Sequence, residues 1–425
     1  MITIAPKPKL IFVPHYVGSL LYFEKLLPFL TARYEVRFLI LFVHQGTYRE
    51  MLDYCRQRNL VHDLIALPKT ADNSKKTKFP VFPLIRDLIF YKKQIRALLN
   101  DKQIKKIISV NDGGIYVGYL MTEANKRGID TAVLQWALAY AYEEQRKMPK
   151  KIVVFWRLVL YRLAKPAYIF FKKLAALLIL GVYQGKGVPG CGAAKRLGVI
   201  NEQALEFYKR HGVPQEKMTI VGHVDFYLAH AKKHQLDTDK TERKKAAEAL
   251  GLDFNKRQIV IFTSAYNSRV INILDDEGQY KFYEGIVKMI REIYPTESHE
   301  ILIKPHPIER TELYRPLEKF GVKIFDRFTD NFTLVYFADL YIADSSTANF
   351  IPIAMSKKVI LMDFFRLPLI EKSAPYFGIK RFIISRDEFL SLLQKHKKGN
   401  LDYQYEGGEK IVVSDSLTKI LSWID

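Results

Sequence analysis

Short apolar runs alternate with helical patterns along the first half of the chain. The runs occupy residues 10–13, 36–43, 105–110 and 131–135, and a further run at 217–222 closes this half. Their length is typical of buried strands. Residues 23–34 and the Leu- and Ile-rich stretch 82–99 have the apolar spacing of helices. Strands that alternate with helices predict a doubly wound, mainly parallel sheet.

The second half repeats this pattern. Apolar runs at 258–264, 300–307, 322–325, 340–346, 358–363 and 381–385 predict strands, and residues 414–423 predict an amphipathic helix. The stretch 231–257 is highly charged, and Gly251 is placed to end a helix there. We therefore expect an α/β protein with two Rossmann-like domains facing a cleft. The expected domains are residues 1–235 and 258–425, joined by a linker at 236–257, and this division suits a chain of 425 residues.

Charge is distributed very unevenly. The chain carries a net charge of +21, and residues 145–201 contain twelve Lys or Arg and no Asp or Glu. Aromatic and aliphatic side chains lie between these cations, which disfavours a nucleic-acid groove and favours a basic amphipathic helix on an anionic membrane surface. The alternative is a buried helix with a basic rim. No apolar run reaches the ~20 residues that span a bilayer.

Other sequence features affect the expected location and the choice of cofactor. The first residues do not have the pattern of a secretory signal, so we expect a cytoplasmic protein held peripherally on the inner face of the membrane. Cys55 and Cys191 are far apart and follow no metal or redox spacing. The Asp-x-Asp at 237–239 lies in the charged stretch without a flanking strand, so we do not expect it to bind metal.

Polar residues that follow three strands of the second half are candidates for a phosphate site. Lys304 and His306 follow one strand, Ser345, Ser346 and Thr347 follow another and precede a helix, and Thr263 and Ser264 follow the first strand of this domain. Ligands bind at the carboxyl ends of strands in open α/β sheets, and a helix N-terminus attracts anions. Taken singly, the Ser-Ser-Thr could be only a helix cap, and the Lys-Pro-His-Pro only a turn.

These residues stand in motifs that resemble a known superfamily. Residues 303–307, 343–360, 221–227 and 244–264 are similar to GT-B enzymes of envelope polymers. That superfamily includes CDP-glycerol glycerophosphotransferases, capsule-linked sugar transferases and bacterial sialyltransferases. The resemblance implies a GT-B fold in which His306, Ser345, Ser346 and Thr347 hold the donor phosphate. It also matches Gly222 and Asp225 to a segment that ends the first domain.

The chain departs from the superfamily pattern in both halves. Ile351 and Pro352 stand where relatives usually continue with Glu-Ala, and that glutamate commonly contacts the ribose of the donor. The resemblance therefore implies that this chain holds its donor nucleoside differently. Gln135, Trp136 and Ala137 replace the Gln-His-Gly often found in the first domain, so the acceptor side is not carried over.

The resemblance further implies transfer without a bound metal or other cofactor. His306 and Lys304 would then meet the charge on the leaving phosphate. A general base must come from the first domain, and His15 and Asp112, each after a predicted strand, are the two candidates. Either could instead be structural. Should neither act as the base, Glu143 is the next candidate.

Three functions remain open at this stage. The first is a glycosyltransferase that moves a sugar from a CMP-, CDP- or UDP-linked donor to a lipid-linked or polysaccharide acceptor in cell-envelope polymer synthesis. The second is a CDP-glycerol-dependent glycerophosphotransferase. The third is a non-catalytic or epimerase-like relative.

Overall fold

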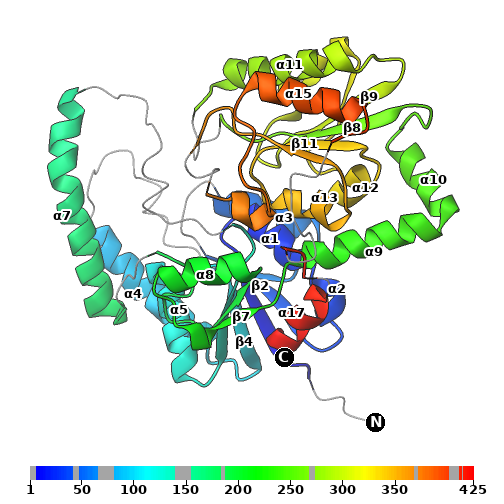
Figure 1. The fold of residues 1–425 in the computed structure, drawn as a ribbon. Helices are drawn as coiled ribbons and strands as arrows, with labels where there is room; N and C mark the ends of the chain where they lie inside the picture. Colours follow the sequence, from blue (N-terminus) through cyan, green and yellow to red (C-terminus); the bar gives the residue numbers. More distant parts are fainter. Residues whose placement is uncertain are drawn as a thin grey trace, which may run out of the picture. The chain divides into compact units, whose positions relative to one another are not determined.

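The computed structural model describes residues 6–41, 47–65, 81–138, 155–182, 187–267, 273–367, 372–401, 411–413 and 415–425, with residues 47, 81–83 and 155–167 described by their backbone alone. They belong to two compact units (Figure 1). The described parts of unit 1 lie within Met1–Ala139, Lys151–Val221 and Lys419–Asp425. Those of unit 2 lie within Gly222–Thr418. Each unit has its own parallel sheet, which confirms the α/β prediction.

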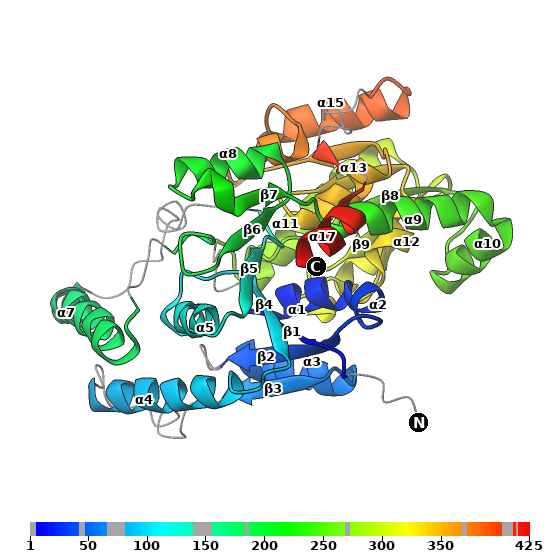
Figure 2. The same ribbon diagram turned by 90° about the horizontal axis from the view of Figure 1, so that it is seen from below.

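Unit 1 is built on a seven-stranded sheet in the order β3-β2-β1-β4-β5-β6-β7 (Figure 2). The strands are β1 (Lys9–Val13), β2 (Glu35–Leu41), β3 (His62–Ile65), β4 (Ile104–Ser109), β5 (Asp130–Leu134), β6 (Arg196–Val199) and β7 (Met218–Ile220). All six neighbouring pairs are parallel. Most residues of the central strands β1, β4 and β5 are buried, as expected where helices cover both faces of a parallel sheet.

The helices of unit 1 fill the connections between these strands. They are α1 (Val17–Glu24), α2 (Leu27–Leu30), α3 (Thr47–Gln57), α4 (Val81–Leu98), α5 (Ile115–Lys126), α7 (Phe155–Leu180) and α8 (Glu202–Arg210). Leu88 and Tyr91 of α4, Leu120 of α5 and Ala176 of α7 belong to one buried cluster with Ile11 of β1. The basic segment thus supplies α7, which packs beside α4 on this cluster.

Unit 2 has a five-stranded parallel sheet in the order β10-β9-β8-β11-β12. Its strands are β8 (Arg257–Phe262), β9 (His299–Lys304), β10 (Val322–Ile324), β11 (Leu340–Ala343) and β12 (Val359–Leu361). Its helices include α9 (Val224–Thr238), α10 (Lys240–Ala249), α11 (Asp276–Ile293), α12 (Asn331–Tyr336), α13 (Phe350–Ala354) and α15 (Arg386–Lys397). Ile286 and Ile290 of α11 and Phe389 and Leu393 of α15 pack on buried Ile259 and Ile301 of the sheet.

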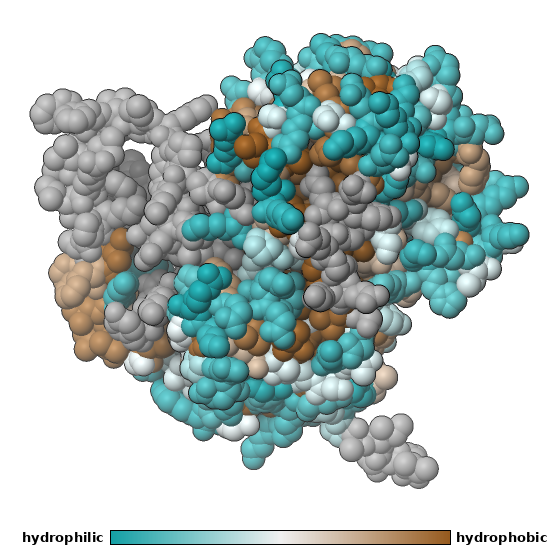
Figure 3. Space-filling model, viewed as in Figure 1, coloured by the Kyte–Doolittle hydropathy of each residue, from teal (hydrophilic) through white to brown (hydrophobic). Residues whose placement is uncertain are grey.

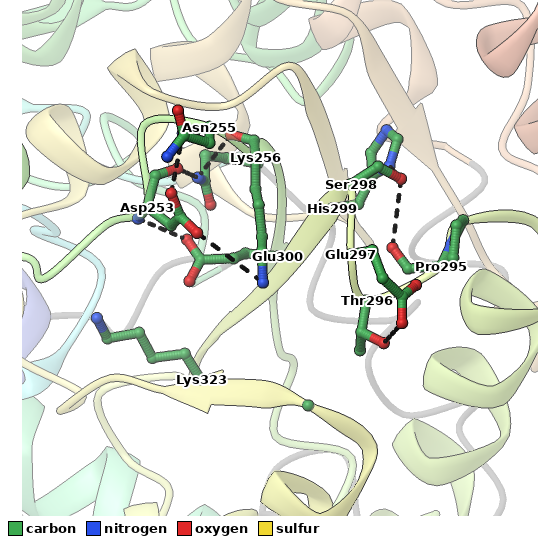
Figure 4. A network of polar contacts seen from close by, with 12 residues as sticks. Asp253, Asn255, Lys256, Pro295, Thr296, Glu297, Ser298, His299, Glu300 and Lys323 are labelled. Atoms are coloured by element: carbon green, nitrogen blue, oxygen red, sulfur yellow. Dashed lines mark hydrogen bonds and ion pairs between the residues drawn. The ribbon is translucent and has the colours of Figure 1, made fainter.

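The amino ends of β8 and β9 are tied together by local polar contacts (Figure 4). The backbone N–H of Asp253 donates to Glu300 Oε2 at 3.1 Å, and Asp253 Oδ1 accepts from the backbone N–H of Asn255 at 2.9 Å. Lys256 Nζ lies 3.9 Å from Asp253 Oδ2. These groups close the loop that leads into β8. The residues predicted to bind phosphate all lie at the opposite edge of the sheet.

Two details of unit 2 differ from the sequence-based expectations, and a third concerns the C-terminal helix. The units divide at 221/222 and not near 235, because α9 crosses the predicted boundary and belongs to unit 2, as does α10, which forms within the predicted linker 236–257. Apolar Phe226 of α9 packs against Phe350 of α13 with ring centroids 5.0 Å apart, and this contact holds α9 in unit 2. The predicted strand 381–385 makes only an isolated bridge between Ile383 and Met362.

The C-terminal helix α17 (Ser416–Ile424) confirms the predicted amphipathic helix, but its last residues return to unit 1. Lys106 Nζ donates to the carbonyl oxygen of Asp425 at 2.6 Å, and the Arg196 guanidinium donates to the carbonyl oxygen of Trp423. The predicted second domain, 258–425, therefore extends too far, because residues 419–425 belong to unit 1.

Candidate functional site

The strand order of unit 2 reverses between β8 and β11. From β8 the chain builds β9 and β10 on one side and then crosses to β11 on the other. Ligands of open α/β sheets bind at such a point, outside the carboxyl ends of the strands. The Ser264 hydroxyl, just after β8, donates to Asp344 Oδ1, just after β11. A side-chain hydrogen bond therefore joins the two loops at this switch point.

Glu309 joins the β8 loop to the β9 loop. Its carboxylate accepts from the Thr263 hydroxyl, from the backbone N–H of His306 at 2.9 Å and from Gln279 Nε2 at 2.7 Å. The Tyr314 hydroxyl also donates to it. Glu309 is only 3% exposed, and burial raises the pKa of its carboxyl while these donors oppose the rise. The network fixes the backbone on which the His306 side chain stands.

His306 presents a neutral imidazole. Burial, and then the nearby charge of Lys304, lower its pKa to about 4. Its Nδ1 accepts from the backbone N–H of Ile308 at 3.3 Å, which assigns the proton to Nε2. The expected role of His306 at a leaving phosphate would then rest on a hydrogen bond and not on a positive charge of the ring. In this structure the ring offers a neutral N–H donor.

Lys304 is held in the interior at the end of β9. It is 4% exposed, its ammonium donates to the carbonyl oxygen of Arg327 at 2.8 Å, and it lies 5.4 Å from the centroid of the Phe262 ring. A buried cation of this kind contributes a positive potential at the loops after β8 and β9 without needing to touch a ligand.

Residues 345–347 form the loop that leads into α13. The Ser346 hydroxyl accepts from the backbone N–H of Ala348 at 3.2 Å and so caps a single 3₁₀ turn, Thr347–Asn349, that precedes the five-residue α13. The cap confirms the sequence pattern, but the helix behind it is too short to supply a large dipole. Ser345 Oγ lies 2.6 Å from Ser373 Oγ, and Ser373 is fully buried. Any anion affinity here must come from hydroxyl and backbone groups of the loop.

Thr263 and Ser264 are less available than the sequence suggested. They are 4% and 7% exposed, and both hydroxyl protons go to buried carboxylates. We interpret them as residues that position the neighbouring loops.

Asp344 lies at the centre of this edge. Burial, together with the nearby carboxylates of Asp363 and Glu309, raises the pKa of its carboxyl to about 7, although the hydrogen bond from Ser264 opposes the rise. The Asp344 carbonyl oxygen accepts from Asn349 Nδ2 at 2.5 Å, so the same residue also anchors the turn that begins at Thr347.

In unit 1 the strand order reverses between β1 and β4. His15 follows β1, and its Nε2 lies 3.4 Å from the hydroxyl of Ser109, the last residue of β4. The backbone N–H of His15 donates to Ser19 Oγ at 2.9 Å, which fixes the turn into α1. His15 is therefore placed at the switch point of its sheet, partly open to solvent.

Asp112 has a different environment. It is 1% exposed, and its two carboxylate oxygens accept from the backbone N–H groups of Gly190, at 2.7 Å, and Ala194, at 3.0 Å. Burial raises the pKa of this carboxyl, and the two N–H donors oppose the rise. A Cβ on Gly192 would lie 2.3 Å from the Asp112 carbonyl oxygen, so the 187–194 loop wraps closely around this residue. Between the two candidate bases, this geometry favours His15.

The other motif residues that the structure describes are held by packing and hydrogen bonds within their own units. Gly222 has φ +82°, and a Cβ there would lie 2.5 Å from Ser416 Cβ. Asp225 is buried in the first turn of α9, 3.8 Å from His223 Nδ1. Ile351 is fully buried in α13, so it fills the core of unit 2. Gln135 donates to the carbonyl oxygen of Ala137 and accepts from the backbone N–H of Ile200. Glu143 lies outside the described residues.

Sequence reasoning missed four interior residues of the unit 2 site: Gln279, Glu309, Asp344 and Ser373. Glu309 comes three residues after His306, and Asp344 stands directly before the Ser-Ser-Thr. Those positions were the only local signal.

No protein-family model matches the chain. No curated protein is similar in sequence either. Solved structures are similar in fold. UDP-GlcNAc 2-epimerase from Neisseria meningitidis, bound to UDP-GlcNAc, has a TM-score of 0.58 at 12% identity over 97% of this chain and 98% of that one. The epimerase from Methanocaldococcus jannaschii has a TM-score of 0.54 at 12% identity over 98% and 99%.

The glycotransferase of kitacinnamycin has a TM-score of 0.55 at 12% identity over 99% of this chain and 100% of that one. These neighbours span almost the whole length of both chains. With its two parallel-sheet units, this chain has the GT-B fold of glycosyltransferases and sugar-nucleotide epimerases.

Proposed function

We propose that the protein is a GT-B-type glycosyltransferase that takes a sugar from a nucleotide-linked donor and passes it to a membrane-associated or polysaccharide acceptor of the cell envelope. The proposal rests mainly on the three loops that follow β8, β9 and β11 in unit 2, which are joined by side-chain hydrogen bonds. There the β8 loop is bonded to the β9 loop through Glu309 and to the β11 loop through Asp344. Neighbours of the same fold bind or act on UDP-GlcNAc, which supports a nucleotide donor.

The chemistry of this edge suits a leaving phosphate. The His306 ring is neutral, so it is not repelled by the nearby charge of the buried Lys304 as a cationic ring would be. Its Nε2–H remains a hydrogen-bond donor. As negative charge builds on the leaving group, the ring can strengthen this hydrogen bond, while Lys304 supplies a fixed positive potential. The Ser345–Thr347 loop adds hydroxyl and backbone groups to the same edge.

The acceptor hydroxyl requires a base, and we assign this role to His15 of unit 1. Its position at the switch point of its own sheet, with Ser109 beside Nε2, supports the assignment. The enclosed Asp112 carboxylate is better suited to hold the loop 187–194.

Two alternatives use the same donor edge. CDP-glycerol could replace the sugar nucleotide, with attack at phosphorus in place of an anomeric carbon. The epimerase neighbours raise a second possibility, in which the chain isomerises a sugar nucleotide and needs no acceptor.

Two measurements test the proposal. A thermal-shift panel of CMP, CDP, UDP and GDP identifies the nucleotide, because a ligand of the native state raises stability by mass action. The protein is then incubated with the matching donors, with and without envelope membranes. Nucleotide release that depends on the membranes supports a transferase. A glycerol donor that outperforms every sugar donor identifies the glycerophosphotransferase. Acceptor-independent formation of an isomeric sugar contradicts the proposal and identifies an epimerase.

A further inference from the structure

Over residues 168–180, one side of α7 exposes apolar side chains. Among residues 168–180 of this helix, every exposed side chain is aliphatic or aromatic, and their exposed fractions run from 38% to 76%. They are Ile169, Phe170, Phe171, Leu174, Leu177 and Leu178. Figure 3 shows apolar surface gathered at this end of α7, at the left of the view. Five of the six, all but Ile169, follow helical spacing and form one stripe.

The other side of the same helix is used for packing. Ala176 and Leu180 are buried in the cluster with α4 and α5, and Ala175 and Ile179 are partly buried against it. Lys92 of α4 donates to the carbonyl oxygen of Ile179 at 2.6 Å, which fixes the end of α7 on unit 1. The exposed stripe is therefore presented by a helix with a defined orientation on its own unit. The core of unit 1 does not need the stripe.

The helix is strongly basic. Its 26 residues include Arg157, Arg162, Lys165, Lys172 and Lys173 and no Asp or Glu. Lys172 and Lys173 lie between the exposed Phe171 and Leu174 and are themselves half-buried. Long cationic side chains beside an apolar stripe can reach lipid phosphates while the stripe enters the acyl boundary.

We propose that the exposed stripe of α7 docks unit 1 on an anionic bilayer surface, with the helix lying in the headgroup plane. Charge selects this occupant: a second copy of the chain would bring an equally basic, acid-free helix to the stripe. Aliphatic side chains such as those of Leu174, Leu177 and Leu178 also match acyl chains better than nucleic-acid phosphates. Among the described residues, no helix has the length and apolar content to cross a bilayer. The inference goes beyond the donor site and does not depend on it.

Vesicle flotation tests the proposal with the full chain. Vesicles of phosphatidylcholine alone are compared with vesicles that contain about one-third phosphatidylglycerol, since cationic side chains are attracted to anionic lipid. The protein should float with the anionic vesicles at low salt, and binding should weaken at high salt because the charges are screened. A protein that ignores anionic vesicles at low salt overturns the proposal.

Variants locate the surface. Replacing Phe170, Leu174, Leu177 and Leu178 together by Gln should lower the partition coefficient by about 100-fold or more, because the apolar contribution is lost while every charge is kept. The matched control replaces Val61, Leu64 and Phe254, which are also exposed apolar residues, by Gln and should bind vesicles like the native protein. Lys172→Gln with Lys173→Gln should reduce binding to anionic vesicles only. Equal binding by the stripe variant and the native protein would place the contact elsewhere and reject the assignment.

Two further readouts separate the remaining outcomes. Sedimentation without lipid shows whether a second copy of the chain covers the stripe. A native dimer that becomes a monomer in the stripe variant overturns the membrane proposal. Nucleotide-induced thermal shift reports unit 2, and the stripe variant should keep the native shift. Loss of vesicle binding with an intact nucleotide response shows that the docking surface is independent of the donor site.

Discussion

The Ser264 hydroxyl donates to the carboxylate of Asp344 across the switch point of the unit 2 sheet. The two residues are 80 positions apart in sequence, and each lies within two residues of the end of its strand. The backbone carbonyl oxygen of Asp344 also accepts from Asn349, so Asp344 bonds both to the loop after β8 and to the turn that begins at Thr347.

The protonation of Asp344 should make stability depend on pH. Its pKa rises from 3.8 in the unfolded chain to about 7 in the folded protein. The folded state keeps this proton where the unfolded state has lost it, so the stabilisation is lost as pH rises from 3.8 to about 7. Asp344→Asn retains an oxygen that accepts from Ser264 and carries no charge. The excess in melting temperature of this variant over the native protein should grow with pH across that window and then level off. A difference that does not vary with pH contradicts the prediction.

His306→Ala should lower turnover by about 10²–10³, the usual loss when one donor to the transition state is removed. His299→Ala is the matched control, since His299 begins β9 at the opposite edge of the same sheet. Steady-state kinetics with the donor identified by thermal shift measures both variants. A kcat/KM for His306→Ala within about threefold of the native value removes His306 from the donor site.

Replacing Ser345 and Ser346 together by Ala should weaken nucleotide binding and leave the fold intact. The change removes the contact of Ser345 with Ser373 and the cap that Ser346 gives to the 3₁₀ turn. Ser385→Ala removes a cap of the same kind from α15 and controls for the general cost of about 1 kcal/mol. Titration calorimetry distinguishes them: unchanged nucleotide affinity in the double variant would defeat this assignment.

His15→Ala should abolish transfer while donor binding and melting temperature stay close to native. The expected separation follows from its place at the switch point of unit 1, partly open to solvent and outside the buried core. Acceptor-dependent turnover and nucleotide thermal shift are measured on the same preparation. If His15→Ala transfers at the native rate, Asp112 is the remaining candidate, and Glu143 is tested if the Asp112 variant also keeps full transfer.

Asp112→Ala should act on stability. The substitution leaves the buried N–H groups of Gly190 and Ala194 without their acceptor, a loss of about 1–3 kcal/mol for each unsatisfied group. Gly192→Ala should destabilise unit 1 in the same way, because its Cβ would overlap the Asp112 backbone. Urea unfolding measures both. Full stability of Asp112→Ala together with lost transfer would return Asp112 to the catalytic candidates.

Periodic features of this fold could be predicted from sequence because they repeat locally. The buried strands around Ile107, Val133, Ile261 and Ile303 were predicted by their apolar runs, and so was the helix at 82–99. Two short strands were not predicted. Only one of the four residues of β3 is buried, and β6 has four residues that include Gly198. Residues 381–385 have strand composition, but only Ile383 reaches a neighbouring strand.

The candidate site was predictable only in part, for a related reason. His306 and Ser345–Thr347 stand at strand ends, and the alternation of strands and helices shows where those ends are. The hydrogen bonds of Thr263 with Glu309 and of Ser345 with Ser373 join distant segments, so no local pattern reveals them. The neutral state of His306 likewise depends on burial by the folded chain.

The return of α17 to unit 1 has a consequence for biosynthesis. Residues 419–425 leave the ribosome only after all of unit 2, yet Trp423 and Asp425 accept hydrogen bonds from Arg196 and Lys106 in the first sheet. Domains usually fold in the order in which they are synthesised, with the N-terminal one first. Here the first unit must wait in an incomplete form while the second is made. Unit 2 can finish folding earlier, and the native contacts of unit 1 are completed last.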